Sequence, residues 1–145
     1  MGYWYYPHSA PRPTPVEGKR NKKFGLTPWG RRWVGVVETI GDDARLSRGR
    51  AYARAERVYN IKFDKGKVAA KVKGSSGTYS VRVEMAPFSK TEWKSLAVKL
   101  QKGEVVGSLL NNELPENIDK VIGVPLIDQD FIAECSCPDY GDPCK

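Results

Sequence analysis

Three cysteines near the C-terminal end of the sequence could bind a metal ion. One residue separates Cys135 from Cys137, and six residues, among them two prolines and a glycine, separate Cys137 from Cys144. Thiolates are favoured ligands of Zn²⁺, which usually takes four nitrogen or sulfur ligands and can order a short segment that has no core of its own. The spacing therefore predicts a zinc site with Cys135, Cys137 and Cys144 as ligands.

Other chemistry is poorly represented in the sequence. A disulfide would leave one of the three thiols over, and nothing else indicates an oxidising compartment. The single histidine, His8, excludes a Cys2His2 finger, an HExxH metalloprotease and a site of the carbonic-anhydrase type. No side chains resemble a Ser-His-Asp or Cys-His nucleophile, and no base adjoins the cysteines to support a zinc hydrolase. We expect a protein that is not an enzyme.

The segment from Cys135 resembles the SWIM zinc finger, whose pattern is Cys-x-Cys-x(n)-Cys-x-His. A wider resemblance to small prokaryotic proteins with this finger includes Trp29-Gly-Arg-Arg-Trp33 and residues 45–54. It implies a small α+β domain followed by the finger, and binding of nucleic acid or protein, sometimes beside Swi/Snf-type ATPases, without catalysis. The histidine of the pattern would stand at position 146, so we expect a chain truncated before its fourth zinc ligand. His8 would replace it only if the N-terminal tail folds back.

Positive charge is concentrated in the first part of the chain. Basic side chains outnumber acidic ones by 12 to 5 in residues 1–57 and by 6 to 2 in residues 58–85, whereas residues 86–145 hold 6 basic and 10 acidic ones. Arginine binds phosphate through paired hydrogen bonds, so this pattern favours a nucleic-acid-binding accessory protein. The expected phosphate contacts are Lys19, Arg20, Lys22, Lys23, Arg31, Arg32, Arg45, Arg48, Arg50 and Arg54.

The sequence leaves the nature of the partner open. RNA, in a ribonucleoprotein such as the ribosome, and DNA are both compatible with contacts to phosphate. The alternative is a protein-interaction adaptor, in which the acidic second half and the finger dock a helicase or a Swi/Snf-type remodelling ATPase. No apolar run approaches the ~20 residues that span a bilayer, and no secretory signal is present, so we expect a cytoplasmic protein without a membrane partner.

Residues 1–23 predict an extended basic tail rich in aromatic residues and proline. Prolines at positions 7, 11, 13 and 15 disfavour both helix and central strand. Its aromatic residues either fold back onto their own domain or stack on bases. They are Tyr3, Trp4, Tyr5 and Tyr6.

An α+β domain is expected over residues 24–130, with the partial finger over residues 131–145. Thr27 and Pro28 begin a helix over residues 28–40, and Gly41 ends it. The polar, arginine-rich residues 42–56 predict a loop that runs into a short strand. Alternation over residues 58–85, interrupted by two turns, predicts a three-stranded antiparallel meander with one apolar face and one face of lysine and arginine.

The remaining residues predict helices and a final extended segment. Ser89 and Glu92 form a capping box before a helix. A short helix is expected over residues 103–111 and another from Pro115, with an extended segment over residues 127–135. The fold class is α+β: a small antiparallel meander packed against the helix at 28–40 and these later helices, with a C-terminal zinc hook.

Overall fold

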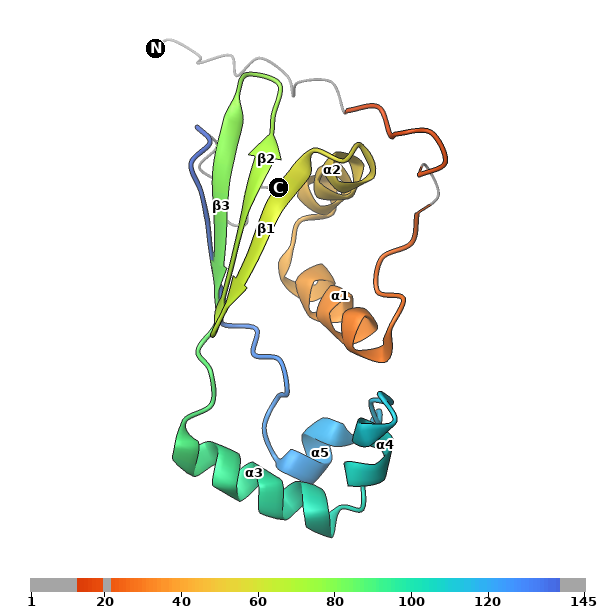
Figure 1. Ribbon diagram of the computed structural model, residues 1–145, viewed down its shortest axis with the longest axis vertical. Helices are drawn as coiled ribbons and strands as arrows, with labels where there is room; N and C mark the ends of the chain where they lie inside the picture. Colours follow the sequence, from red (N-terminus) through yellow and green to blue (C-terminus); the bar gives the residue numbers. More distant parts are fainter. Residues whose placement is uncertain (1–12, 20–21, 139–145) are drawn as a thin grey trace, which may run out of the picture.

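The fold is built on a four-stranded sheet. The structure is a computed structural model that describes residues 13–19 and 22–138 (Figure 1). Its sheet is antiparallel throughout, in the order β1-β2-β3-β4. The first three strands confirm the predicted meander, and the fourth lies within the segment predicted to be extended. The strands are β1 (Val58–Asp64), β2 (Lys67–Lys73), β3 (Thr78–Glu84) and β4 (Ile132–Cys135).

Helix α1 (Pro28–Ile40) confirms the predicted helix over residues 28–40. Thr27 caps it by accepting a hydrogen bond from the backbone N–H of Gly30 at 3.0 Å. Gly41 ends it, and a Cβ there would lie 2.7 Å from the side chain of Leu46. Glycine therefore allows the next helix to pack close to the end of α1.

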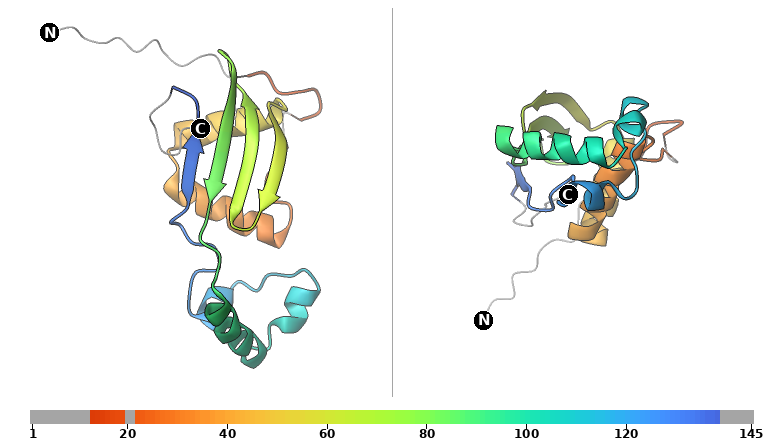
Figure 2. Two further views of the ribbon diagram at one scale, coloured as in Figure 1. Left: turned by 60° about the vertical axis from the view of Figure 1, so that its left-hand side comes forward. Right: turned by 90° about the horizontal axis from the view of Figure 1, so that it is seen from below.

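The prediction of a loop over residues 42–56 is wrong, because α2 (Asp43–Arg54) occupies most of it. The Asp42 carboxylate caps the helix by accepting from the backbone N–H groups of Ala44 and Arg45. Only Tyr52 is buried along its length. Without an apolar stripe the segment has no helical period to detect, although alanine, leucine and arginine all favour helix. Both α1 and α2 cover one face of the sheet and leave the other uncovered (Figure 2).

Three helices form a cluster inserted between β3 and β4 in the sequence. They lie beyond one end of the sheet (Figures 1 and 2), so the prediction that they pack against the meander is wrong. The cluster has its own core of Leu96, Val105, Ile118 and Ile122, which makes packing on the sheet unnecessary. The helices are α3 (Lys90–Lys102), α4 (Val106–Leu110) and α5 (Ile118–Ile122).

The capping box of α3 is confirmed. Ser89 Oγ accepts from the backbone N–H of Glu92 at 3.2 Å, and the Glu92 carboxylate accepts from the backbone N–H of Ser89 at 2.7 Å. These hydrogen bonds to the backbone and side chain of Ser89 hold the pKa of Glu92 below its ordinary value. Within the described ranges, no helix has the length and apolar character needed to cross a bilayer.

Candidate nucleic-acid interface and zinc segment

Cys135 is the last residue of β4, and Cys137 follows two residues later at a bend in the chain. Ser136 between them is held to Ser80 of β3 by two hydrogen bonds: its backbone N–H donates to the Ser80 carbonyl at 3.0 Å, and its Oγ accepts from the Ser80 N–H at 2.8 Å. Ser136 is exposed, whereas both cysteines are half-buried.

This arrangement fits half of a zinc site. Cys135 carries a free thiol, and two thiolates separated by one residue can occupy two corners of a tetrahedron. Cys144 and His8 lie outside the described residues. Over residues 13–19 and 22–138, no group of three or more His, Cys, Asp or Glu side chains is placed to hold a metal ion. Zinc therefore stays a prediction that rests on Cys135 and Cys137 and on ligands elsewhere.

Two arginines of α1 and α2 form ion pairs within the protein. Arg32 in α1 pairs with Asp119 in α5, and this pair links the first helix to the helical cluster. Arg50 in α2 pairs with Glu38 in α1 at 3.2 Å between Nη2 and Oε1. A phosphate would have to compete with these carboxylates. Exposed ion pairs are worth only about 0–1 kcal/mol, so that competition is not prohibitive.

Other predicted phosphate contacts also have partners in the chain. Arg31 donates to the Leu26 carbonyl at 3.0 Å. Arg54 donates to the Lys22 carbonyl at 3.3 Å, and its guanidinium lies 5.5 Å from the centre of the Phe24 ring. These contacts fix the segment before α1 against the two helices.

The remaining predicted contacts differ in their surroundings. Lys19 pairs with Glu56. Arg48 is half-buried, and its Nε atom is buried without a hydrogen-bond partner. Arg45 is also half-buried, whereas Lys22 and Lys23 are exposed. Arg20 and the four tail aromatics, Tyr3, Trp4, Tyr5 and Tyr6, lie outside the described residues. Within residues 13–19 and 22–138, the predicted contacts therefore do not form one free basic surface.

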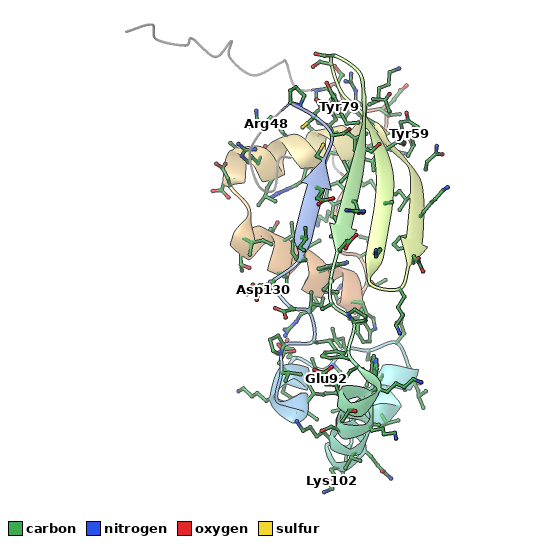
Figure 3. The ribbon with its side chains drawn as sticks, turned by 90° about the vertical axis from the view of Figure 1, so that its left-hand side faces the viewer. Arg48, Tyr59, Tyr79, Glu92, Lys102 and Asp130 are labelled. Carbon is green, nitrogen blue, oxygen red and sulfur yellow. The ribbon has the colours of Figure 1, made fainter. Side chains whose placement is uncertain are left out.

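A different set of basic residues shares the uncovered face of the sheet. In β1, Tyr59 pairs with Lys71 of β2 and Lys62 pairs with Ala69, so Asn60 and Ile61 form a bulge between them. Because Ala69 and Lys71 lie two residues apart in β2, they share a face, and Tyr59 and Lys62 share it with them. Lys73 lies two residues beyond Lys71 on the same exposed face. Figure 3 looks onto this face, with Tyr59 at the upper end of the sheet.

The acidic side chains of this face gather at its other end. Glu84 contacts both Lys67 and Arg82, at 3.4 and 3.0 Å, and Arg82 also pairs with Glu134 at 2.6 Å. At that end both Lys67 and Arg82 have carboxylate partners.

Three lysines of the same face meet no carboxylate. Lys71 donates to Ser80 Oγ at 2.7 Å. In the part of the chain that the structure describes, Lys62 and Lys73 form neither an ion pair nor a side-chain hydrogen bond. The uncovered face therefore has a free ammonium group at Lys62 and Lys73 and a third, hydroxyl-bound one at Lys71.

Sequence reasoning recognised this basic face but did not treat it as a site. The alternation of lysines along β2 was the available signal. The position of Lys62 beside Tyr59 depends on the bulge, where Asn60 takes a left-handed φ of 51°. A strict two-residue alternation would not predict this position of Lys62.

One curated relative is similar to almost the whole chain. The uncharacterized protein Rv2102 of Mycobacterium tuberculosis is 37% identical over 155 aligned residues, which cover 98% of this chain and 55% of the relative. The chain thus spans little more than half the length of the relative that it matches. No family model and no solved structure matches the chain.

Proposed function

We propose that this chain is a nucleic-acid-binding accessory protein with no catalytic activity of its own. The observation that supports it best is the set of ammonium groups of Lys62, Lys71 and Lys73, which meet no carboxylate on the uncovered face of the sheet. Neutralising backbone phosphates with such groups releases condensed counterions, which is the main source of non-specific affinity. RNA in a ribonucleoprotein such as the ribosome, and DNA, are both suitable partners.

The arginines contribute less to phosphate binding in this proposal than the sequence predicted. Arg32 and Arg50 stabilise the packing of α1 through their ion pairs, and Arg31 and Arg54 hold the segment before α1 through its backbone carbonyls. Lys22 and Lys23 are exposed and can add to the positive field. The tail residues predicted to bind phosphate or stack on bases remain part of the proposal.

The test of binding uses the purified full chain and labelled oligonucleotides of mixed sequence. Fluorescence anisotropy at physiological salt should give a Kd in the range of about 10⁻⁴ to 10⁻⁶ M or tighter. Polyglutamate should compete weakly, since it offers charge without bases or sugar. Absence of binding to both single-stranded and duplex probes, with the protein folded by circular dichroism, would rule out the proposal.

A zinc ion is the second part of the proposal, with Cys135, Cys137 and Cys144 as three ligands and the fourth supplied by another group. Bound zinc would close the C-terminal segment into an ordered loop. The cysteines must be reduced to bind it, which agrees with a location in the cytoplasm. Metal analysis of the purified protein should find about one zinc per chain. The Cys135→Ser, Cys137→Ser double variant should lose it, whereas equal zinc content in both proteins would contradict this role.

The adaptor is the second candidate function. It is favoured by exposed apolar side chains on the helical cluster, where Trp93 is 53% and Leu110 is 82% exposed. The partner would be a helicase or a Swi/Snf-type ATPase. After nuclease treatment of an extract, an ATPase that stays bound to the tagged chain and is lost on Leu110→Asp would favour the adaptor. Loss of the ATPase with nuclease alone would favour nucleic-acid binding.

A further inference from the structure

The Tyr59 side chain lies across the uncovered face of the sheet. Tyr59 belongs to the edge strand β1, yet its hydroxyl donates to Thr78 Oγ1 in β3 at 3.4 Å. The side chain must therefore cross β2, which separates the two strands by about 10 Å in all. It is 40% exposed. A side chain that crosses β2 in this way lies along the surface of the sheet, and part of it is open to solvent.

Lysines surround this ring without any carboxylate. Lys71 is the direct cross-strand neighbour of Tyr59, and Lys73 is the direct neighbour of Thr78, the residue that holds the Tyr59 hydroxyl. The bulge at Asn60 and Ile61 brings Lys62 onto the same face. Tyr59, Lys62, Lys71 and Lys73 are termed the Tyr59 platform below.

We propose that the Tyr59 platform binds a single-stranded stretch of nucleic acid, with one base stacked on Tyr59 and the adjoining phosphates bound by the three lysines. This inference rests on the proposed function and specifies its ligand and its contact surface. Aromatic rings that lie flat among basic side chains bind single strands because every base has a π-face, whatever the sequence. The hydrogen bond to Thr78 holds the ring in place before the base arrives, so less entropy is lost on binding.

A duplex fits this surface less well. Its bases are stacked inside the helix, so their faces cannot reach Tyr59. A major groove about 12 Å wide admits an α-helix or a two-stranded ribbon. The outer strands of this four-stranded sheet lie about 14 Å apart, so the sheet cannot enter the groove.

The charge test measures anisotropy of labelled oligo(dT) of about 12 nucleotides, within the site sizes typical of single-strand modules. The Lys62→Gln, Lys71→Gln, Lys73→Gln variant should lower the steepness of log K against log salt by about 2, because each lost phosphate contact removes about 0.7. The matched control is Lys90→Gln, Lys94→Gln, Lys102→Gln, an equal charge change on exposed positions of α3. Figure 3 shows Lys102 at the far end of the molecule from Tyr59. This control should leave the slope unchanged.

The stacking test separates the ring from its hydroxyl. Tyr59→Ala should weaken oligo(dT) binding by about 10-fold or more. Tyr59→Phe keeps the π-face and loses only the hydroxyl contact that holds the ring to Thr78, so its loss of affinity should be clearly smaller than that of Tyr59→Ala. Thermal unfolding of each variant establishes that the fold is retained.

The outcomes separate this inference from the proposed function. If the wild type binds no nucleic acid at all, the proposed function fails, and this inference fails with it. If it binds oligo(dT) but the platform and control triple variants behave alike, only the platform is overturned. Tighter binding of a hairpin duplex than of oligo(dT) would overturn the single-stranded ligand. Polyglutamate binding as tight as oligo(dT), and equally lost in the platform variant, would identify an acidic peptide surface instead.

Discussion

At the scale of single residues, the Ser89 hydroxyl stabilises the start of α3. It accepts from the backbone N–H of Glu92, one of the groups at the start of a helix that has no partner inside it. Replacement of such a cap by alanine costs about 1 kcal/mol. We expect Ser89→Ala to lower the free energy of unfolding by that amount in a denaturant titration. Ser95→Ala, at an exposed position inside α3, should not be destabilising, and equal losses in both variants would contradict the role of the cap.

Glu92 gives this cap a dependence on pH. Its pKa is lowered in the folded protein by hydrogen bonds to the backbone and side chain of Ser89, so the ionised form is favoured by folding. Its contribution to stability is complete above the ordinary glutamate pKa of about 4.3 and is lost as pH falls through the lowered value. The stability difference between wild type and Glu92→Gln should therefore shrink from pH 6 to about pH 3. A stability difference between the two proteins that does not change with pH would contradict this role of Glu92.

Residue-level signals could be read from the sequence where they are local. The Thr27 cap and the Ser89–Glu92 box each need only four neighbouring residues, and both are confirmed. The partners of Arg32 could not be predicted in that way, because Asp119 is far along the chain and the two meet only through tertiary packing. A surplus of arginine therefore did not show which guanidinium groups are free.

At the scale of elements, the pair of Arg32 and Asp119 ties α1 to α5. Both side chains are about one-third exposed, at 32% and 34%, which limits the strength of the pair. Asp119 also accepts from the Leu126 N–H at 3.0 Å, a bond that asparagine can keep. A double-mutant cycle with Arg32→Gln and Asp119→Asn should give a coupling of about 0.5–1 kcal/mol in unfolding experiments. Strict additivity would show that the pair does not hold the elements together.

The helical cluster depends on its own small core. Ile122 is 1% exposed and packs with Leu96, Val105 and Ile118. Ile122→Ala should cost about 2–5 kcal/mol of unfolding free energy, because a cavity replaces the side chain. Leu110→Ala is the matched control at a position 82% exposed and should change stability by less than about 0.5 kcal/mol. Similar losses in the two variants would contradict this core.

Elements were predictable where apolar periodicity marks them. Apolar and polar residues alternate along β2 and β3, and α1 carries an apolar stripe, so both the meander and the helix were found. In α2 only Tyr52 is buried, and the helix is specified by its Asp42 cap and by helix-forming residues instead. The bulge in β1 was equally hidden, although it decides which side chains join Tyr59 on the uncovered face.

At the scale of the whole molecule, the two helices on one face of the sheet leave the other face open to a partner (Figure 2). The sequence predicted a basic first half, and the structure divides that charge into paired arginines around α1 and α2 and lysines without acidic partners on the sheet. Composition could predict that the first half is basic, but it could not predict how the charge is divided. The division depends on which charges tertiary packing brings together.

The salt dependence of nucleic-acid affinity tests the central claim most directly. For the wild-type chain and oligo(dT), the three platform lysines alone should give a slope of log K against log salt of about −2, steeper if tail or helix residues add contacts. Binding whose strength does not change with salt concentration would contradict contact through phosphates and, with it, the proposed function.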